Sequence, residues 1–204
     1  MYSLVTQALL HKQWEEETEE TESLPASSRG NSSISSHVAA LRTAFAQAEE
    51  QVLNERRWSY QGSTAVAVWV HEAMNGARTL LSANVGDSRA VLSREGKAVN
   101  LTQDHKPSTE RERNRIMQHG ETIEWDSKAK THRVKSLSVS RAIGDAYAKP
   151  VVSSEVDIKL FPILEGKDDF VILASDGLWD VMSSQEVVSF VNDRFQSELS
   201  QRET

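Results

Sequence analysis

The feature that most restricts the fold is a set of three β-type segments that follow one another closely. They are rich in Val, Leu and Ala, and they span Ser63 to Val70, Thr79 to Val85 and Ala90 to Ser93. The turn signals Asn75-Gly76 and Gly86-Asp87 separate them. Connections this short leave no room for the crossover helix that parallel neighbours need. The spacing therefore predicts an antiparallel meander.

A segment with helical periodicity precedes these strands. Residues 37–57 carry Val38, Leu41 and Phe45 at spacings of three and four, after a serine pair that can cap a helix. The pattern predicts one amphipathic helix with its apolar face toward the sheet.

Two capping boxes predict further helix starts. Thr109 with Glu112 opens one helix, whose Arg and Glu side chains are expected to face water. Ser183 with Glu186 opens another over residues 185–195.

The run from Phe170 to Ala174 is apolar throughout, which predicts a central, fully buried strand. Strands in the middle of the chain, with helices before, between and after them, favour the α+β class with helices packed on largely antiparallel sheets.

The two ends of the chain differ from the middle. Residues 1–14 have the periodicity of an amphipathic helix. Residues 15–36 are rich in Glu, Ser and Thr, which predicts a solvated or disordered acidic insertion. Residues 196–204 are interpreted as a tail.

Composition excludes several classes of protein. The sequence has no cysteine, so it contains neither a disulfide scaffold nor a thiolate nucleophile. Its net charge is −7, of which residues 15–22 contribute −6, so the remaining −1 gives no basic face for nucleic acid. The longest apolar run, Ala65 to Val70, is too short to span a bilayer, and the first ten residues lack the pattern of a signal peptide. These observations predict an intracellular protein, cytoplasmic or nuclear, that binds neither nucleic acid nor membranes.

The strongest chemical signal is Ser175-Asp176-Gly177-Leu178-Trp179-Asp180, where the predicted buried strand ends in two acids four residues apart. If a helical turn follows the strand, Asp180 lies on the same face as Asp176. Two carboxylates in that arrangement can bind Mg²⁺ or Mn²⁺. The alternative is that Asp176 caps the helix and Asp180 is a solvated surface acid, and these six residues alone slightly favour it.

Three other features have structural alternatives. Asp87 lies in a tight turn that is read most simply as a hairpin connection. Arg141 and Asp145 are expected to form an ion pair that fixes a loop. Trp125 is either part of the core or an exposed contact, and the core is favoured. The sequence contains neither the serine turn of α/β-hydrolases nor a phosphate-binding glycine loop.

Taken together, five strings resemble the metal-dependent protein phosphatases of the 2C type, in the order and spacing of that family. They are Gln61-Gly62-Ser63-Thr64-Ala65, Asn84-Val85-Gly86-Asp87-Ser88-Arg89-Ala90, Asp104-His105-Lys106-Pro107, Leu137-Ser138-Val139-Ser140-Arg141-Ala142-Ile143-Gly144-Asp145 and Leu173-Ala174-Ser175-Asp176-Gly177-Leu178-Trp179-Asp180-Val181. The resemblance covers residues 37–195 and is strongest to plant and protist members.

The resemblance implies two packed antiparallel sheets with helices on both outer faces. It implies hydrolysis of phosphoserine and phosphothreonine in proteins by a metal-activated water, with no protein nucleophile. Two Mg²⁺ or Mn²⁺ ions are expected, with Asp176 as a direct ligand. Asp87 and Asp180 resemble acids that bind a third, weaker ion and water around the first two. The implied partners of this monomer are a phosphoprotein substrate and, at Trp125, a regulatory protein.

The sequence also departs from the family pattern. It contains neither the Asp-Gly-His-Gly-Gly motif that the family carries upstream of the first helix nor the last acidic ligand, an Asp followed by Asn. The predicted fold is therefore incomplete at both ends.

Two dications about 4 Å apart repel by about 16 kcal/mol at an effective dielectric of about 20. One direct and two outer acids do not offset this repulsion, so we expect weak metal binding and slow or absent hydrolysis. The alternative function is a catalytically impaired binding or regulatory protein.

Overall fold

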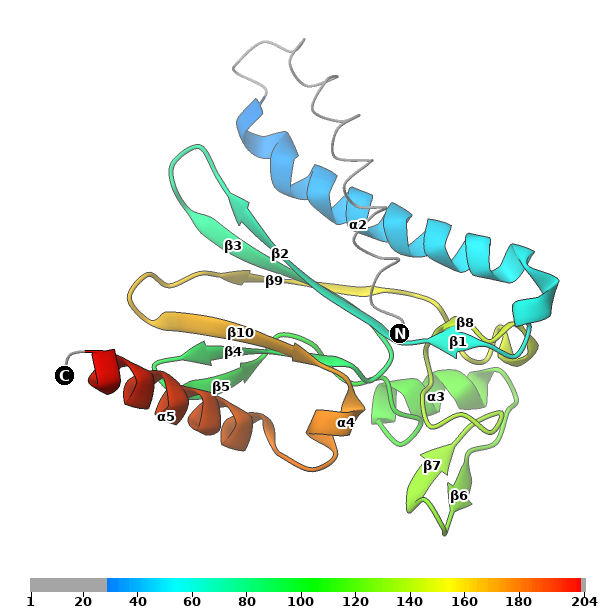
Figure 1. The fold of residues 1–204 in the computed structure, drawn as a ribbon. Helices are drawn as coiled ribbons and strands as arrows, with labels where there is room; N and C mark the ends of the chain where they lie inside the picture. The colour runs from blue at the N-terminus through cyan, green and yellow to red at the C-terminus, as the bar shows by residue number, and fades with distance from the viewer. Residues whose placement is uncertain (1–28, 203–204) are drawn as a thin grey trace.

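Two three-stranded antiparallel sheets lie between helices α2 and α5 (Figure 1). The computed structural model describes residues 29–202. One sheet has the order β2-β3-β9 and the other has the order β10-β4-β5. Their strands are β2 (Ala65–Glu72), β3 (Arg78–Val85), β9 (Asp157–Pro162), β10 (Asp168–Ala174), β4 (Arg89–Arg94) and β5 (Lys97–Asn100). The prediction of an α+β fold with two antiparallel sheets and flanking helices is confirmed.

The remaining elements cover the sheets or lie beside one end of them. The helices are α2 (Arg29–Asn54), η1 (Arg56–Trp58), α3 (Glu110–Gln118), η2 (Ala146–Ala148), α4 (Asp176–Trp179) and α5 (Ser184–Arg202). Two small sheets pair β1 (Gly62–Ser63) with β8 (Ile143–Gly144) and β6 (Glu124–Asp126) with β7 (Thr131–Arg133). Among residues 29–202, no helix has the length and apolar character needed to cross a membrane.

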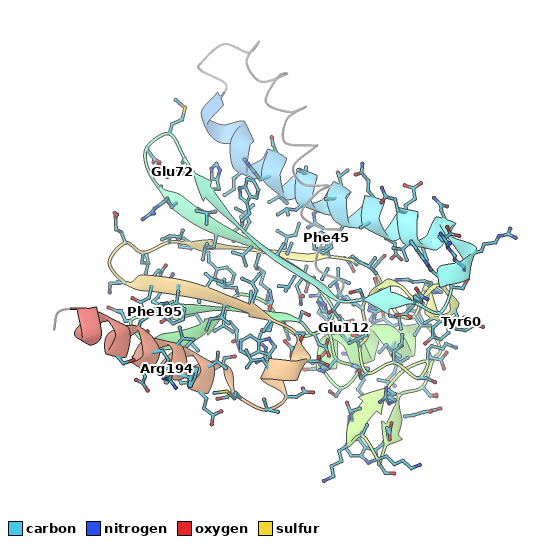
Figure 2. The ribbon with its side chains drawn as sticks, viewed as in Figure 1. Phe45, Tyr60, Glu72, Glu112, Arg194 and Phe195 are labelled. Atoms are coloured by element: carbon cyan, nitrogen blue, oxygen red, sulfur yellow. The ribbon has the colours of Figure 1, made fainter. Side chains whose placement is uncertain are left out.

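Strand β3 carries apolar side chains on both of its faces. Leu81 and Ala83 face α2 and pack with Leu41 and Phe45, whose side chain points from the helix toward the sheet (Figure 2). Leu80, on the opposite face, packs in a cluster with apolar residues of the second sheet. Because successive strand residues point to opposite faces, one strand contributes to both the helix–sheet and the sheet–sheet core.

Helix α2 begins before the predicted position. Residues 29–36, assigned from composition to the acidic insertion, form its first turns. Ile34 packs against the cluster under α2, one turn ahead of Val38, and this contact extends the apolar stripe into a polar segment. The predicted helix over 1–14 and the rest of the insertion lie outside the described residues.

The first three long strands do not form one meander. β2 and β3 pair as predicted, but β4 pairs with β10 and β5 in the opposite sheet. The segment Val85 to Arg89 therefore crosses from one sheet to the other and is not a hairpin within a sheet. Turn signals predicted where the chain reverses but not which layer it enters next.

Strand β10 is an edge strand within residues 29–202, not the fully buried central strand that its apolar run predicts. It pairs with β4 on one side, and no described strand pairs with the other. Leu173 is 45% exposed.

The last helix, α5, follows the second predicted capping box. Ser183 and Glu186 bond reciprocally, with Ser183 N–H donating to Glu186 Oε2 over 2.7 Å and Glu186 N–H donating to Ser183 Oγ over 3.3 Å. The helix continues through Arg202, past the predicted end at residue 195.

Candidate active site

The crossing from β3 to β4 positions Asp87 between the two sheets. Gly86 has a φ of +99°, which favours glycine, and a Cβ there would overlap the Thr64 side chain. Beside it, the Thr64 and Ser88 hydroxyls are hydrogen bonded over 2.8 Å. Asp87 is 3% exposed. The turn that composition reads as an ordinary hairpin therefore places a buried carboxylate at one end of the sandwich.

Asp87 forms an ion pair with Lys106, whose Nζ donates a hydrogen bond to Asp87 Oδ2. Burial raises the pKa of Asp87, and repulsion from Asp176 adds to that effect, although the bond to Lys106 opposes it. Asp87 and Asp176 are therefore close enough to interact electrostatically.

Asp176 and Asp180 bracket the single turn α4 at the end of β10. Asp180 N–H donates to the Asp176 carbonyl over 2.8 Å, so the helical turn that was expected after the strand is present. Trp179 donates its indole N–H to the Ala174 carbonyl over 2.8 Å and fixes the turn against the strand. The Arg89 guanidinium lies 5.2 Å from the Trp179 ring centroid.

Lys106 lies in the field of all three predicted aspartates. Burial lowers the pKa of its ammonium group, but the hydrogen bond to Asp87 and the charges of Asp180 and Asp176 outweigh burial, so the pKa is raised. The structure thus brings three aspartates, from the β3–β4 crossing and the β10–α4 turn, to one end of the sandwich.

These aspartates do not enclose a metal ion by themselves. In the part of the chain that the structure describes, no group of three or more His, Cys, Asp or Glu side chains is close enough to hold a metal. One oxygen of Asp87 is already bonded to an ammonium group. The described donor set therefore does not fit a metal pair, because too few carboxylates are present to offset the repulsion between two dications.

A histidine behind the crossing fixes its position, and sequence reasoning gave it no role. The Gly86 N–H donates to His105 Nδ1 over 3.0 Å, while the backbone N–H of His105 donates to the Gly86 carbonyl over 3.0 Å. Because Nδ1 accepts, Nε2 carries the proton and donates to Asp157 Oδ2 over 3.1 Å. Asn84 supports the same turn, donating to the Gly86 and Gln103 carbonyls.

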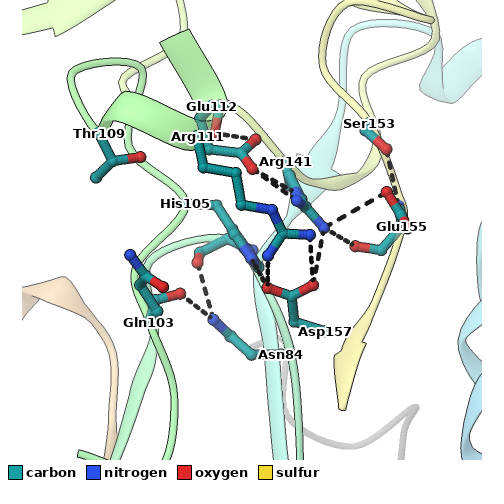
Figure 3. Close-up of polar contacts among 12 residues, drawn as sticks. Asn84, Gln103, His105, Thr109, Arg111, Glu112, Arg141, Ser153, Glu155 and Asp157 are labelled. Atoms are coloured by element: carbon teal, nitrogen blue, oxygen red, sulfur yellow. Dashed lines mark hydrogen bonds and ion pairs between the residues drawn. The ribbon is translucent and has the colours of Figure 1, made fainter. Parts of the chain in front are cut away.

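Behind His105 lies a buried ion-pair network (Figure 3). Arg141, which is 1% exposed, donates to Glu112 Oε1 from Nη2 over 2.6 Å and from Nε over 3.1 Å. Its Nη1 also reaches Asp157 Oδ1 over 3.3 Å. Burial would raise the pKa of Glu112, but Arg141, Arg115 and a hydroxyl lower it to about 2.

Two local predictions fail in this network. Arg141 pairs with Glu112 and Asp157 rather than with Asp145. Glu112 is buried and does not act in the predicted capping box with Thr109, whose hydroxyl instead donates to the Lys106 carbonyl over 2.9 Å. A carboxylate bonded to two guanidinium groups is fully satisfied inside the protein, so burial was favoured over a cap at the surface.

Trp125 is exposed rather than part of the core. It lies on the β6–β7 hairpin, is 57% exposed, and packs edge-on against His132 at a ring-centroid distance of 4.9 Å. The short hairpin leaves both strands without a covering layer, so its aromatic side chain remains at the surface.

Comparisons with known proteins agree with the fold and identify the family. The protein phosphatase 2C family model matches residues 6–203. Protein phosphatase 2C homolog 1 of Schizosaccharomyces pombe is 42% identical over 132 residues, covering 64% of this chain and 36% of that protein. Protein phosphatase 2C 3 of Arabidopsis thaliana is 45% identical over 131 residues, covering 64% of this chain and 28% of that protein.

Among solved structures, the serine-threonine phosphatase 2C from Toxoplasma gondii has a TM-score of 0.70 at 24% identity, covering 96% of this chain and 68% of that one. This likeness shows a shared fold. The protein is thus an α–β–β–α sandwich with acidic residues gathered at one end. The chain belongs to the protein phosphatase 2C family. It spans less than half of the length of curated relatives such as these.

Proposed function

We propose that this chain is a metal-dependent protein phosphatase acting on phosphoserine and phosphothreonine, with Mg²⁺ or Mn²⁺ as its ion. The observation that supports this most is the convergence of Asp87, Asp176 and Asp180 around Lys106 in a member of the 2C family. Asp176 is the proposed direct ligand, and Asp87 and Asp180 are the proposed outer acids. An ion held by these acids would supply a more acidic bound water and would offset charge on the phosphoryl oxygens.

The chain's own contribution is positioning. His105 and Gly86 fix the turn that carries Asp87 through two hydrogen bonds of 3.0 Å each. Arg89 bonds Asp104 through Nε and Nη2 over 3.0 and 2.7 Å, while its Nη1 donates to Ser184 over 3.0 Å. These contacts connect the β3–β4 crossing to α5 and leave the acidic end of the sandwich little freedom to rearrange.

A second candidate function is a phosphatase-like binding or regulatory protein. It is favoured by the described donor set, which does not enclose a metal, and by the exposed Trp125, which offers an aromatic contact for a regulatory protein. Aromatic side chains of this kind are common anchors in protein interfaces.

One experiment separates the two functions. The full chain is titrated with Mn²⁺ by calorimetry and then assayed for turnover of a phosphothreonine peptide, beside Asp176→Asn as the matched variant. Slow turnover that requires Mn²⁺ and disappears in Asp176→Asn supports the phosphatase. Turnover equal to that of buffer at every Mn²⁺ concentration contradicts it and favours the binding protein. Micromolar binding of two ions with ordinary turnover would show that our expectation of weak metal binding is wrong.

A further inference from the structure

The buried ring of His105 makes two hydrogen bonds with opposite roles. Its Nδ1 accepts the Gly86 N–H over 3.0 Å, and its Nε2 lies 3.1 Å from Asp157 Oδ2. A neutral imidazole has one donor and one acceptor nitrogen, and its neighbours decide which nitrogen carries the proton. A backbone N–H can only donate and a carboxylate can only accept. Both neighbours therefore require the tautomer with the proton on Nε2.

Asp157, the first residue of β9, is kept as a carboxylate by the side chains around it (Figure 3). Arg111 donates to its two oxygens over 2.7 and 3.1 Å, and Arg141 donates to Oδ1 over 3.3 Å. Burial would raise the pKa of Asp157, but the hydrogen bonds from His105 and Arg111 and the charge of Arg141 lower it. The group that faces Nε2 is therefore an ionised acceptor at neutral pH.

Gly86 connects the His105 ring to the candidate site, because it directly precedes Asp87 in the crossing from β3 to β4. Its φ is +99°, and a Cβ there would overlap the Thr64 side chain, so the turn is closely packed. A proton on Nδ1 would face the Gly86 N–H, donor against donor. The buried N–H would lose its partner, and the turn would have to move together with Asp87.

We propose that Asp157 is a positioning residue of the candidate active site. It holds the neutral His105 ring in the tautomer with the proton on Nε2, and through that ring it fixes the turn that carries Asp87. The proposal rests on the proposed function in one respect, namely that Asp87 belongs to the active site.

The test replaces the carboxylate by an amide. In Asp157→Asn, the side chain accepts on one side and donates on the other. Guanidinium groups keep their protons, so we expect the amide oxygen to face Arg141 and the amide nitrogen to face His105. The imidazole can accept that new donor by moving its proton from Nε2 to Nδ1. An amide in place of a carboxylate has this effect on a neighbouring histidine in other proteins.

Nitrogen-15 NMR of the full chain measures both ends of this contact. The ring nitrogens of His105 report the tautomer, and hydrogen exchange of the Gly86 amide reports the turn. In Asp157→Asn we expect the proton on Nδ1 and Gly86 exchange about tenfold faster than in the parent, because one buried hydrogen bond is lost. Arg111→Gln is the matched control. It removes one partner of the same carboxylate and leaves the charge, so the parent's tautomer and Gly86 exchange are expected.

A second background separates positioning through the ring from a purely structural role. In His105→Asn, the shorter side chain keeps an amide oxygen near the place of Nδ1, so Gly86 keeps an acceptor that has no tautomer. Adding Asp157→Asn to His105→Asn is then expected to leave Gly86 exchange unchanged. A purely structural role of Asp157 predicts the same acceleration with and without His105→Asn.

The proposal is wrong if Asp157→Asn keeps the proton on Nε2, if its Gly86 amide exchanges like that of the parent, or if Arg111→Gln accelerates exchange equally. Should Asp157→Asn fail to fold, Asp157→Ala, which removes the carboxylate and adds no donor, undergoes the same measurements. A single tautomer with the proton on Nε2 in Asp157→Ala would equally overturn the proposal. None of these readouts uses a metal ion or turnover. Reversal of the tautomer in a chain without turnover would keep the positioning residue and remove the phosphatase.

Discussion

At the scale of single residues, two glycines share one backbone conformation and differ in their surroundings. Gly144 and Gly76 both have a φ of +80°. A Cβ on Gly144 would overlap the Gln61 carbonyl, where β1 and β8 pair, whereas a Cβ on Gly76 would meet nothing within 4 Å. Substituting each glycine by alanine therefore separates the free-energy cost of a left-handed backbone from the cost of a steric overlap.

We expect Gly144→Ala to lower the free energy of unfolding by about 3 kcal/mol and Gly76→Ala by about 1 kcal/mol. Urea denaturation of both variants measures the difference. Equal losses would show that the close approach of β1 and β8 relaxes freely and that backbone conformation alone matters.

Glu112 is the buried carboxylate on which two guanidinium groups converge, and Glu110 is an exposed acid on the same helix. Glu112→Gln leaves Arg141 buried with a weaker partner, so we expect it to lose about 3 kcal/mol of unfolding free energy. Glu110→Gln is expected to change stability by less than about 0.5 kcal/mol. Chemical denaturation at neutral pH is the measurement, and similar losses in both variants would contradict the role given to the network.

Whether a side-chain contact could be predicted from the sequence depended on how far apart its two residues lie along the chain. The Ser183–Glu186 box was predicted correctly because both partners lie within one helical turn. The Glu112–Arg141 pair joins residues 29 positions apart, which no local pattern reveals. Local rules therefore assigned Glu112 to a cap and Arg141 to the wrong carboxylate.

At the scale of elements, the described part of β10 is an apolar strand with one unpaired side. Unpaired strands of this kind are templates for pairing with another chain. Leu173 on β10 is 45% exposed, and Phe190 on α5 is 54% exposed. The two residues expose similar fractions of their side chains, but only one lies on a strand edge.

We expect Leu173→Lys to weaken any self-association of the chain by about tenfold, because it places a charge beside the open edge. Phe190→Lys is the control, since a helix surface offers no unpaired backbone groups. Sedimentation equilibrium over a range of protein concentrations measures both. An equal effect of the two substitutions would point to general hydrophobic association, and a parent chain that stays monomeric at every concentration would rule out the edge as an association site.

The existence and type of the main elements followed from the sequence, whereas their neighbours did not. The apolar period identified β2, β3, β4 and β10, but it carried no information about which sheet receives each strand. The hydrophobic run of β10 would suit a central strand, yet the described chain pairs only one of its sides. Hydrophobic periodicity indicates which face of an element is buried. The pairing of strands is decided by contacts between segments that are distant in the sequence.

At the scale of the whole molecule, the candidate site exists only through the packing of the two sheets. Asp87 belongs to the crossing between them, and Asp176 follows β10 in the second sheet. Both acids belong to motifs of one family, but no spacing in the sequence indicated that Lys106 would pair with Asp87 and feel the charge of Asp176. The sequence therefore named the acids of the candidate site, whose metal binding stays a prediction, and the ion pair with Lys106 emerged only from the structure.

The network around Glu112 also sets how the whole fold responds to acid. The pKa of Glu112 is lowered from 4.5 to about 2, and the pKa of Asp157 is lowered as well because His105, Arg111 and Arg141 favour its charged form over the effect of burial. A carboxyl group whose pKa is lower in the folded state stabilises the fold fully above its unfolded pKa. That contribution is lost as the pH falls from about 4.5 through about 2.

Burial raises the pKa of Asp87 and Asp145, so protonation of these two groups in acid favours the folded state. This effect offsets part of the stability that is lost at Glu112 and Asp157. We expect the unfolding free energy of the parent to decline below about pH 4.5, with Glu110→Gln following the same slope. Glu112→Gln, already less stable at neutral pH, is expected to decline less steeply because it has lost the group that must be protonated. Urea denaturation at successive pH values compares the three slopes. Parallel curves for Glu112→Gln and the parent would show that this carboxylate does not link protonation to unfolding.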